Sequence, residues 1–222
     1  MAAMGARDPE ETLAAMAAAA ARAAPPAALG DEAALQEIIG KARVSEPTVE
    51  HRVTVVLLCG FMEADPTRLV RWFQRLSEHG VRFEAVRLVG LAAPKRQITC
   101  FDKWETPAWF DYITETYNTE DIIDETQLAQ SRRLLTQIID AEVARLGGRS
   151  DRVVLLGFSQ GGNMAYDVAL SYPAQLGGLI ARRTSLRNES QLGSHYALPI
   201  THFHGEDDDG IGCNRGEAGV AR

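Results

Sequence analysis

The sequence is poor in cysteine and has no excess of positive charge. Only Cys59, Cys100 and Cys213 occur among the 222 residues, and no two of them form a C-x-x-C pair. Three widely spaced cysteines do not form a disulfide framework, so we expect a reducing, cytoplasmic environment. The net charge of −7 provides no basic surface for a phosphate backbone, which argues against nucleic acid as a partner.

The sequence also lacks a long apolar run. Residues 13–29 are mostly alanine, are interrupted by Arg22 and by the pair Pro25-Pro26, and follow an acidic stretch at residues 8–11. A transmembrane helix needs about 20 consecutive apolar residues, and a signal peptide begins with positive charge. We therefore expect neither a transmembrane segment nor a signal peptide.

Residues 1–50 are predicted to be an alanine-rich helical extension followed by a linker. Asp8 as a cap and Pro9 at the first helical position favour a helix over residues 9–24. Asp31 is suited to begin a second, short helix, and residues 41–52 form a polar linker. The remaining length and the 45% hydrophobic content fit one further domain over residues 51–209, with an atypical tail at 210–222.

From residue 53 onward, short apolar strands alternate with amphipathic helices. Strands are predicted at 53–58, 83–89, 152–156, 176–181 and 199–203, and helices at 67–79, 124–146 and 163–170. This alternation predicts an α/β fold, with a mostly parallel sheet covered by helices on both faces. In such sheets, ligands bind beyond the carboxyl ends of the strands.

A long connection over residues 90–123 shows little regular pattern and is rich in aromatic residues. Loops of this length are often functional, so Trp104, Trp109 and Phe110 are candidates for lining an apolar substrate groove. The alternative, which fits equally well, is that these rings attach the loop to the body of the protein.

The most informative motif is Gly-Phe-Ser-Gln-Gly-Gly at residues 157–162. It follows a predicted strand and precedes a predicted helix, which is the context of a nucleophile elbow. In an elbow a sharp turn exposes a serine hydroxyl, and glycines on both sides relieve steric crowding. Ser159 is therefore the candidate nucleophile. The alternative is an ordinary serine in a turn.

A serine nucleophile requires a base, and an acid that orients the base, in the chain order Ser, Asp or Glu, His. The acid is expected in the segment His-Gly-Glu-Asp-Asp at residues 204–208, directly after a predicted strand. No histidine follows His204, and the four others are His51, His79, His195 and His202. None of the five is well placed as the base. His202 and His204 share a strand face near acidic residues, but the calcium spacing is absent and we predict no metal.

Three segments resemble the acyl-protein thioesterase and phospholipase/carboxylesterase family of α/β-hydrolases over about residues 53–209. They are the elbow, the Pro-Ala-Trp-Phe-Asp stretch at residues 107–111 and the acid turn at residues 204–208. The resemblance implies that Ser159 is the nucleophile, that Asp208 is the acid, and that the backbone amides of Gln160 and Phe61 bind the oxyanion. It also implies an enzyme without a cofactor. Dimeric assembly is a further expectation for this chain. Its substrates would be S-acylated, for example palmitoylated, proteins or lipid-like esters.

The chain departs from the family pattern in two places. Residues 59–63, Cys-Gly-Phe-Met-Glu, stand where relatives usually have H-G-x-G, and the last strand and helix of the domain are not recognisable. Two hypotheses follow. The first is a serine esterase or thioesterase, and the second is a truncated or inactive hydrolase-like binding protein that lacks the catalytic histidine.

Overall fold

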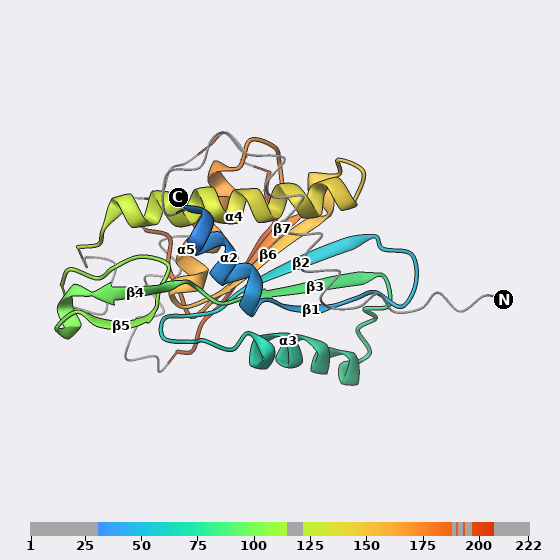
Figure 1. The fold of residues 1–222 in the computed structure, drawn as a ribbon. Helices are drawn as coiled ribbons and strands as arrows, with labels where there is room; N and C mark the ends of the chain where they lie inside the picture. Colours follow the sequence, from blue (N-terminus) through green and yellow to red (C-terminus); the bar gives the residue numbers. More distant parts are fainter. Residues whose placement is uncertain (1–30, 115–121, 188–189, 191–192, 194–196, 207–222) are drawn as a thin grey trace.

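The computed structural model describes residues 31–114, 122–187, 190, 193 and 197–206. Its centre is a six-stranded sheet in the order β1-β3-β2-β6-β7-β8 (Figure 1). The strands are β1 (Arg43–Ser45), β2 (Val53–Leu58), β3 (Val86–Leu91), β6 (Val153–Phe158), β7 (Gly178–Arg182) and β8 (Ile200–Phe203). Only β1 runs antiparallel to its neighbour. The predicted α/β fold with a mostly parallel sheet is confirmed.

Helices cover both faces of this sheet (Figure 1). The helices α2 (Asp31–Lys41), α4 (Glu125–Arg145) and α5 (Gln160–Ser171) lie on one face, and α3 (Thr67–Gln74) lies on the other. Within β2, Val56 and Leu58 join the hydrophobic cluster on the α4 side, while Val55 and Leu57 join the cluster on the α3 side. Because successive side chains point to opposite faces, a strand buried on both sides is expected to be predominantly apolar.

Residues 31–45 pack onto this sheet. Leu35, Ile38 and Ile39 of α2 are buried in the cluster on the α4 side, and β1 pairs with β3 along Arg43–Ser45. The prediction of a polar linker over residues 41–52 is therefore wrong in its first part, because a three-residue edge strand is too short to produce a recognisable alternation. The predicted helix over residues 9–24 lies outside the described residues.

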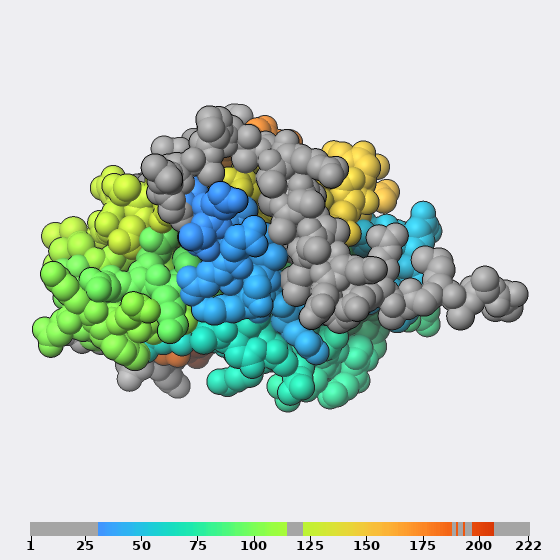
Figure 2. Space-filling model, in the orientation of Figure 1, coloured from blue at the N-terminus to red at the C-terminus, as the bar shows by residue number. Residues whose placement is uncertain are grey.

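The long connection after β3 contains regular structure that its sequence did not suggest. The strands β4 (Lys95–Ile98) and β5 (Trp104–Pro107) form an antiparallel hairpin around a 3₁₀ turn at Thr99–Phe101. The hairpin forms one end of the molecule, beside α2 (Figure 2). Its strands are mostly polar and only half of their residues are exposed, so they lack the apolar alternation that predicts a strand.

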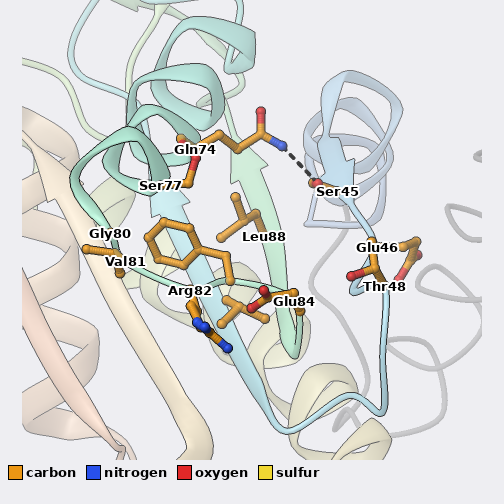
Figure 3. A pocket seen from close by; sticks show the side chains of 12 residues that line it. Ser45, Glu46, Thr48, Gln74, Ser77, Gly80, Val81, Arg82, Glu84 and Leu88 are labelled. Carbon is orange, nitrogen blue, oxygen red and sulfur yellow. Dashed lines mark hydrogen bonds between the residues drawn. The ribbon is translucent and has the colours of Figure 1, made fainter.

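An open hollow of 580 Å³ lies where β3 begins, between the strands and α3 (Figure 3). Leu88 and Phe83 supply apolar walls, and Glu46, Glu84 and Arg82 supply charges. This position is at the amino ends of the parallel strands, opposite the end where Ser159 follows β6. In the described part of the chain, no helix combines the length and the apolar character needed to cross a membrane.

Candidate active site

Ser159 occupies a strained turn between β6 and α5. Its backbone has φ 52° and ψ −123°, in a region that residues other than glycine rarely adopt. Its N–H donates to the carbonyl of Arg182 at 3.0 Å, and its own carbonyl accepts from Thr184 Oγ1 at 2.8 Å. The amides of Gly162 and Asn163 donate to that same carbonyl at 2.8 and 3.1 Å. These bonds fix the turn and leave Ser159 half-buried.

The glycines around Ser159 are required by close backbone contacts. A Cβ added to Gly157 would lie 2.3 Å from the carbonyl oxygen of Gly161, and one added to Gly161 would lie 2.3 Å from that of Cys59. At Gly162 the obstacle is the Thr184 side chain, 2.5 Å away. The expectation that glycine relieves crowding in the elbow is confirmed in this strand, turn and helix.

The loop after β2 lies beside the elbow. A Cβ built on Gly60 would be 3.4 Å from the Cβ of Ser159, so the following residue, Phe61, is in the neighbourhood of the nucleophile. The loop is fixed by a bond from Met62 N to the Pro107 carbonyl at 2.9 Å and by one from Gly60 N to Glu63 Oε2 at 3.2 Å. Among the described residues, no backbone carbonyl accepts the N–H of Phe61 or of Gln160.

Cys59 is a packing residue in this structure. Its side chain is fully buried, and burial raises the pKa of its thiol far above the ordinary value, with Glu63 and Asp65 adding to the shift. The thiol therefore stays protonated near neutral pH. Because the thiolate is the reactive form, Cys59 is unsuited to act as a second nucleophile.

The three aromatic candidates for a substrate groove occupy different surroundings. Trp109 and Phe110 are 0% exposed and belong to the hydrophobic cluster on the α4 side, whereas Trp104 is 53% exposed. The structure thus gives Trp109 and Phe110 the packing role, the alternative raised by the sequence. Contact between a substrate and Trp104 stays a prediction. Phe61 stacks on Phe101 and meets Tyr112 edge-on, with ring centroids 5.9 and 5.5 Å apart.

The side chain of Gln160 joins the elbow to the segment that contains these rings. Its Oε1 accepts from Trp109 N at 2.8 Å, and its Nε2 donates to the Phe110 carbonyl at 2.9 Å. Sequence reasoning assigned a role only to the Gln160 amide. The residues in contact are about fifty positions apart, so no local spacing indicates the bonds, although the two motifs that they join were both recognised.

None of the histidines that the structure describes forms a hydrogen bond with Ser159. His51 Nε2 lies 2.9 Å from Thr54 Oγ1 at the amino end of β2, and His79 is exposed at the end of the helical segment after α3. His202 Nδ1 is 3.0 Å from the Tyr166 hydroxyl, and its ring stacks on His204. Burial lowers the pKa of His202, and the neighbouring His204 lowers it further.

The acid turn follows β8 at the same end of the sheet as Ser159. The register places Phe158 opposite Arg182, and Arg182 opposite Phe203. The residues that follow β6 and β8 therefore lie at the same, carboxyl end of the sheet. The described part of this turn ends at Glu206. Asp208, the predicted acid, and His195 lie outside the described residues. Among the residues described, no group of three His, Cys, Asp or Glu side chains is arranged to hold a metal ion.

A family model described as phospholipase/carboxylesterase matches residues 39–219. The chain belongs to this family. The match extends beyond the predicted domain at both ends, so the boundaries at residues 50 and 209 stay predictions. Acyl-protein thioesterase 1 of Schizosaccharomyces pombe is 30% identical over 151 residues, which are 68% of this chain and 64% of that protein. The chain thus spans less than two thirds of that relative.

Further similar proteins are consistent with this assignment. Acyl-protein thioesterase 1 homolog 2 of Dictyostelium discoideum is 29% identical over 173 residues, 75% of each chain. The crystal structure of Arabidopsis thaliana SOBER1 has a TM-score of 0.67 at 25% identity, covering 77% of this chain and 81% of that one. The crystal structure of Zea mays acyl-protein thioesterase 2, at 19% identity and a TM-score of 0.65, supports the fold alone. The match covers 81% of this chain and 82% of that one.

Proposed function

We propose that this protein is a serine hydrolase that cleaves carboxylic esters or thioesters with Ser159 as its nucleophile. The observation that supports this most is the backbone of Ser159, which is held at φ 52° between a buried strand and a helix. Such strain persists only where the surroundings enforce it, and it clusters at functional sites. Relatives named acyl-protein thioesterase and carboxylesterase support the choice of acyl substrates.

In this mechanism Ser159 Oγ attacks the acyl carbonyl and gives its proton to a base, forming a tetrahedral oxyanion. The N–H groups of Gln160 and Phe61 donate to that oxyanion, and the amino end of α5 adds a favourable dipole. Collapse of the intermediate expels the thiol or alcohol and leaves an acyl-serine. Water then hydrolyses the acyl-serine, releasing the carboxylic acid and restoring Ser159.

The substrate class we propose is an acyl group on a protein cysteine or on a lipid-like alcohol. Phe61, in the loop beside the nucleophile, contacts the rings of Phe101 and Tyr112, so apolar surface gathers on this loop. Apolar and aromatic walls with a few polar groups are typical of sites for such ligands. A cytoplasmic location, dimeric assembly and Asp208 as the acid belong to the same proposal.

Labelling with a fluorophosphonate tests the nucleophile. The purified chain should become covalently labelled at Ser159, and the label should be lost in Ser159→Ala. Ser171→Ala is the matched control, because Ser171 lies at the far end of α5 with its hydroxyl bonded to the Asp167 carbonyl. Absence of labelling in a folded wild type, or equal labelling in Ser159→Ala, contradicts the assignment.

A second candidate function is supported by the surroundings of Ser159. Among the described residues, no histidine forms a hydrogen bond with its hydroxyl, and His202 is bonded to Tyr166 instead. A protein with this site but without a base would bind acyl ligands and turn them over slowly. Hydrolysis of a short p-nitrophenyl ester separates the two. Turnover that disappears in Ser159→Ala indicates the enzyme, and saturable binding of a fatty acyl ligand without turnover indicates the binding protein.

A further inference from the structure

We infer that Trp109 is a positioning residue that fixes the two segments of the oxyanion site relative to each other. The inference rests on the proposed function, because it concerns the amides of Gln160 and Phe61. The side chain of Trp109 is fully buried and therefore does not touch a substrate. Trp109 would influence the reaction by holding the two segments that it joins.

Trp109 forms one hydrogen bond with each of these segments. Its backbone N–H donates to Gln160 Oε1 at 2.8 Å, which holds the residue directly after the nucleophile. Its indole Nε1–H donates to the carbonyl of Cys59 at 2.8 Å, which holds the start of the loop that contains Phe61. One buried residue thus bridges the elbow and the oxyanion loop.

The bridge is itself attached to the body of the protein. Ser131 Oγ of α4 donates to the carbonyl of Trp109, and Arg96 donates to Ser131 Oγ at 3.2 Å and to the Ala108 carbonyl at 3.0 Å. Burial lowers the pKa of Arg96, with several nearby carboxylates opposing the shift. The bonds connect β4, α4 and Trp109 into one network.

This placement matters because oxyanion stabilisation depends on exact geometry. Two N–H groups assist the reaction only when both lie at hydrogen-bond distance from the position of the oxyanion. A displacement of about 1 Å can reduce the rate by about a hundredfold, even when the displaced group lies remote from the reacting atoms. A bridge that sets the separation between Phe61 and Gln160 should therefore affect the chemical step more than the binding of substrate.

Trp109→Phe tests the bridge, because it removes the indole N–H but keeps an aromatic ring in the core. Tyr172→Phe is the matched control. It also removes one polar atom from a buried aromatic residue, namely a hydroxyl that donates to Asp140, but it does so at the far end of α5. Both variants should be studied well below their melting temperatures, so that a general loss of stability does not contribute.

The first measurement is hydrogen exchange of the intact variants, which does not require activity. In Trp109→Phe, the amides of residues 59–63 should exchange at least about tenfold faster than in the wild type, while those of β7 stay unchanged. Tyr172→Phe should leave residues 59–63 unchanged. Equal exchange of this loop in the wild type and in Trp109→Phe would overturn the inference.

The second measurement separates positioning from simple packing. The limiting rate of fluorophosphonate labelling should fall by about tenfold or more in Trp109→Phe, while the probe concentration at half-saturation stays the same. A loss confined to the half-saturation concentration, or no loss, would also overturn the inference. If the wild type does not label, the proposed function fails, and the exchange measurement alone decides the role of Trp109.

Ser131→Ala provides a milder variant in case Trp109→Phe does not fold. It removes the donor to the Trp109 carbonyl and leaves both bonds of the bridge possible. Because Trp109 then loses an anchor, we expect the same two changes in the same direction but smaller. Faster exchange of residues 59–63 without any fall in the limiting labelling rate would contradict the inference.

Discussion

At the scale of single residues, Ser159 combines a backbone conformation that costs free energy with a side chain that is only partly buried. The strain is balanced by bonds to Arg182, Thr184 and the first turn of α5. Replacing the serine should therefore remove reactivity, and the choice of the replacement should decide whether the strain is relieved.

Ser159→Gly is expected to be more stable than Ser159→Ala. At an ordinary helix or strand position, glycine is less stable than alanine by about 0.5–1 kcal/mol. At φ 52° the order should reverse, because alanine retains the strain of about 1–3 kcal/mol and glycine does not. Urea unfolding of the two variants measures the difference. An alanine variant as stable as the glycine variant, or more so, would show that the turn is unstrained.

Gly161→Ala should be strongly destabilising. Its Cβ would lie 2.3 Å from the Cys59 carbonyl and 2.4 Å from that of Leu58, and these backbone atoms cannot rotate away. We expect a loss of at least about 2 kcal/mol in the free energy of unfolding. The control is Gly40→Ala in α2, where a Cβ meets nothing within 4 Å and alanine should gain about 0.5–1 kcal/mol. Equal effects at the two positions would contradict the crowding argument.

The residues of the elbow could be predicted because the constraint is local. A glycine, a serine and two more glycines within six positions reveal a turn that tolerates no side chains. The bridge through Trp109 could not be predicted, because it joins residues 59, 109 and 160 through atoms that any tryptophan or glutamine possesses. Only the fold determines which of those atoms meet.

At the scale of helices and strands, the buried pair of Arg132 and Asp167 connects α4 to α5. The guanidinium donates to both carboxylate oxygens, at 2.6 and 2.8 Å, and Asp167 is fully buried. Because α5 begins at the nucleophile, this pair helps to fix the helix on which the elbow depends.

Arg132→Met should destabilise the protein by about 3–5 kcal/mol, because it leaves a buried carboxylate without its partner. Adding Asp167→Leu should recover much of that loss, since the uncompensated charge disappears. The control is Arg149→Met, which breaks an exposed pair with Asp151 and should have no measurable effect. Thermal and urea unfolding check the series. A single variant as stable as the control would show that the pair contributes little.

Strands with apolar side chains on both faces and helices with one apolar face could be predicted from the sequence. Short strands with exposed, polar side chains could not. β2 and α4 appeared within a residue or so of their predicted bounds, because β2 is a short apolar run and α4 carries its apolar residues at helical spacing. β1 and the hairpin of β4 and β5 were missed because hydrogen bonds to neighbouring strands, rather than burial, define them.

At the scale of the whole molecule, the carboxyl ends of the parallel strands lie together. Ser159, the residues after β7 and the described start of the acid turn therefore lie at the same end of the sheet. The fold predicts this convergence from strand order alone. It does not predict the base, since the sequence contains no histidine beyond His204. Among the described histidines, His202 lies on β8, the strand that pairs with β7. The pH dependence of stability therefore reports on the packing around β8.

Stability should decrease as the pH falls below the unfolded-state pKa of histidine, about 6.5, and His202 should account for part of the decrease. Burial beside Tyr166 and His204 lowers the pKa of His202 in the folded state, so the unfolded chain binds more protons in this range. The stabilisation from neutral His202 is complete above the unfolded value and is lost as the pH falls towards the folded value. His202→Gln should therefore flatten the dependence of melting temperature on pH between about pH 7 and pH 5. Equal slopes in the wild type and in His202→Gln would show that His202 is protonated as readily in the folded protein as in the unfolded chain.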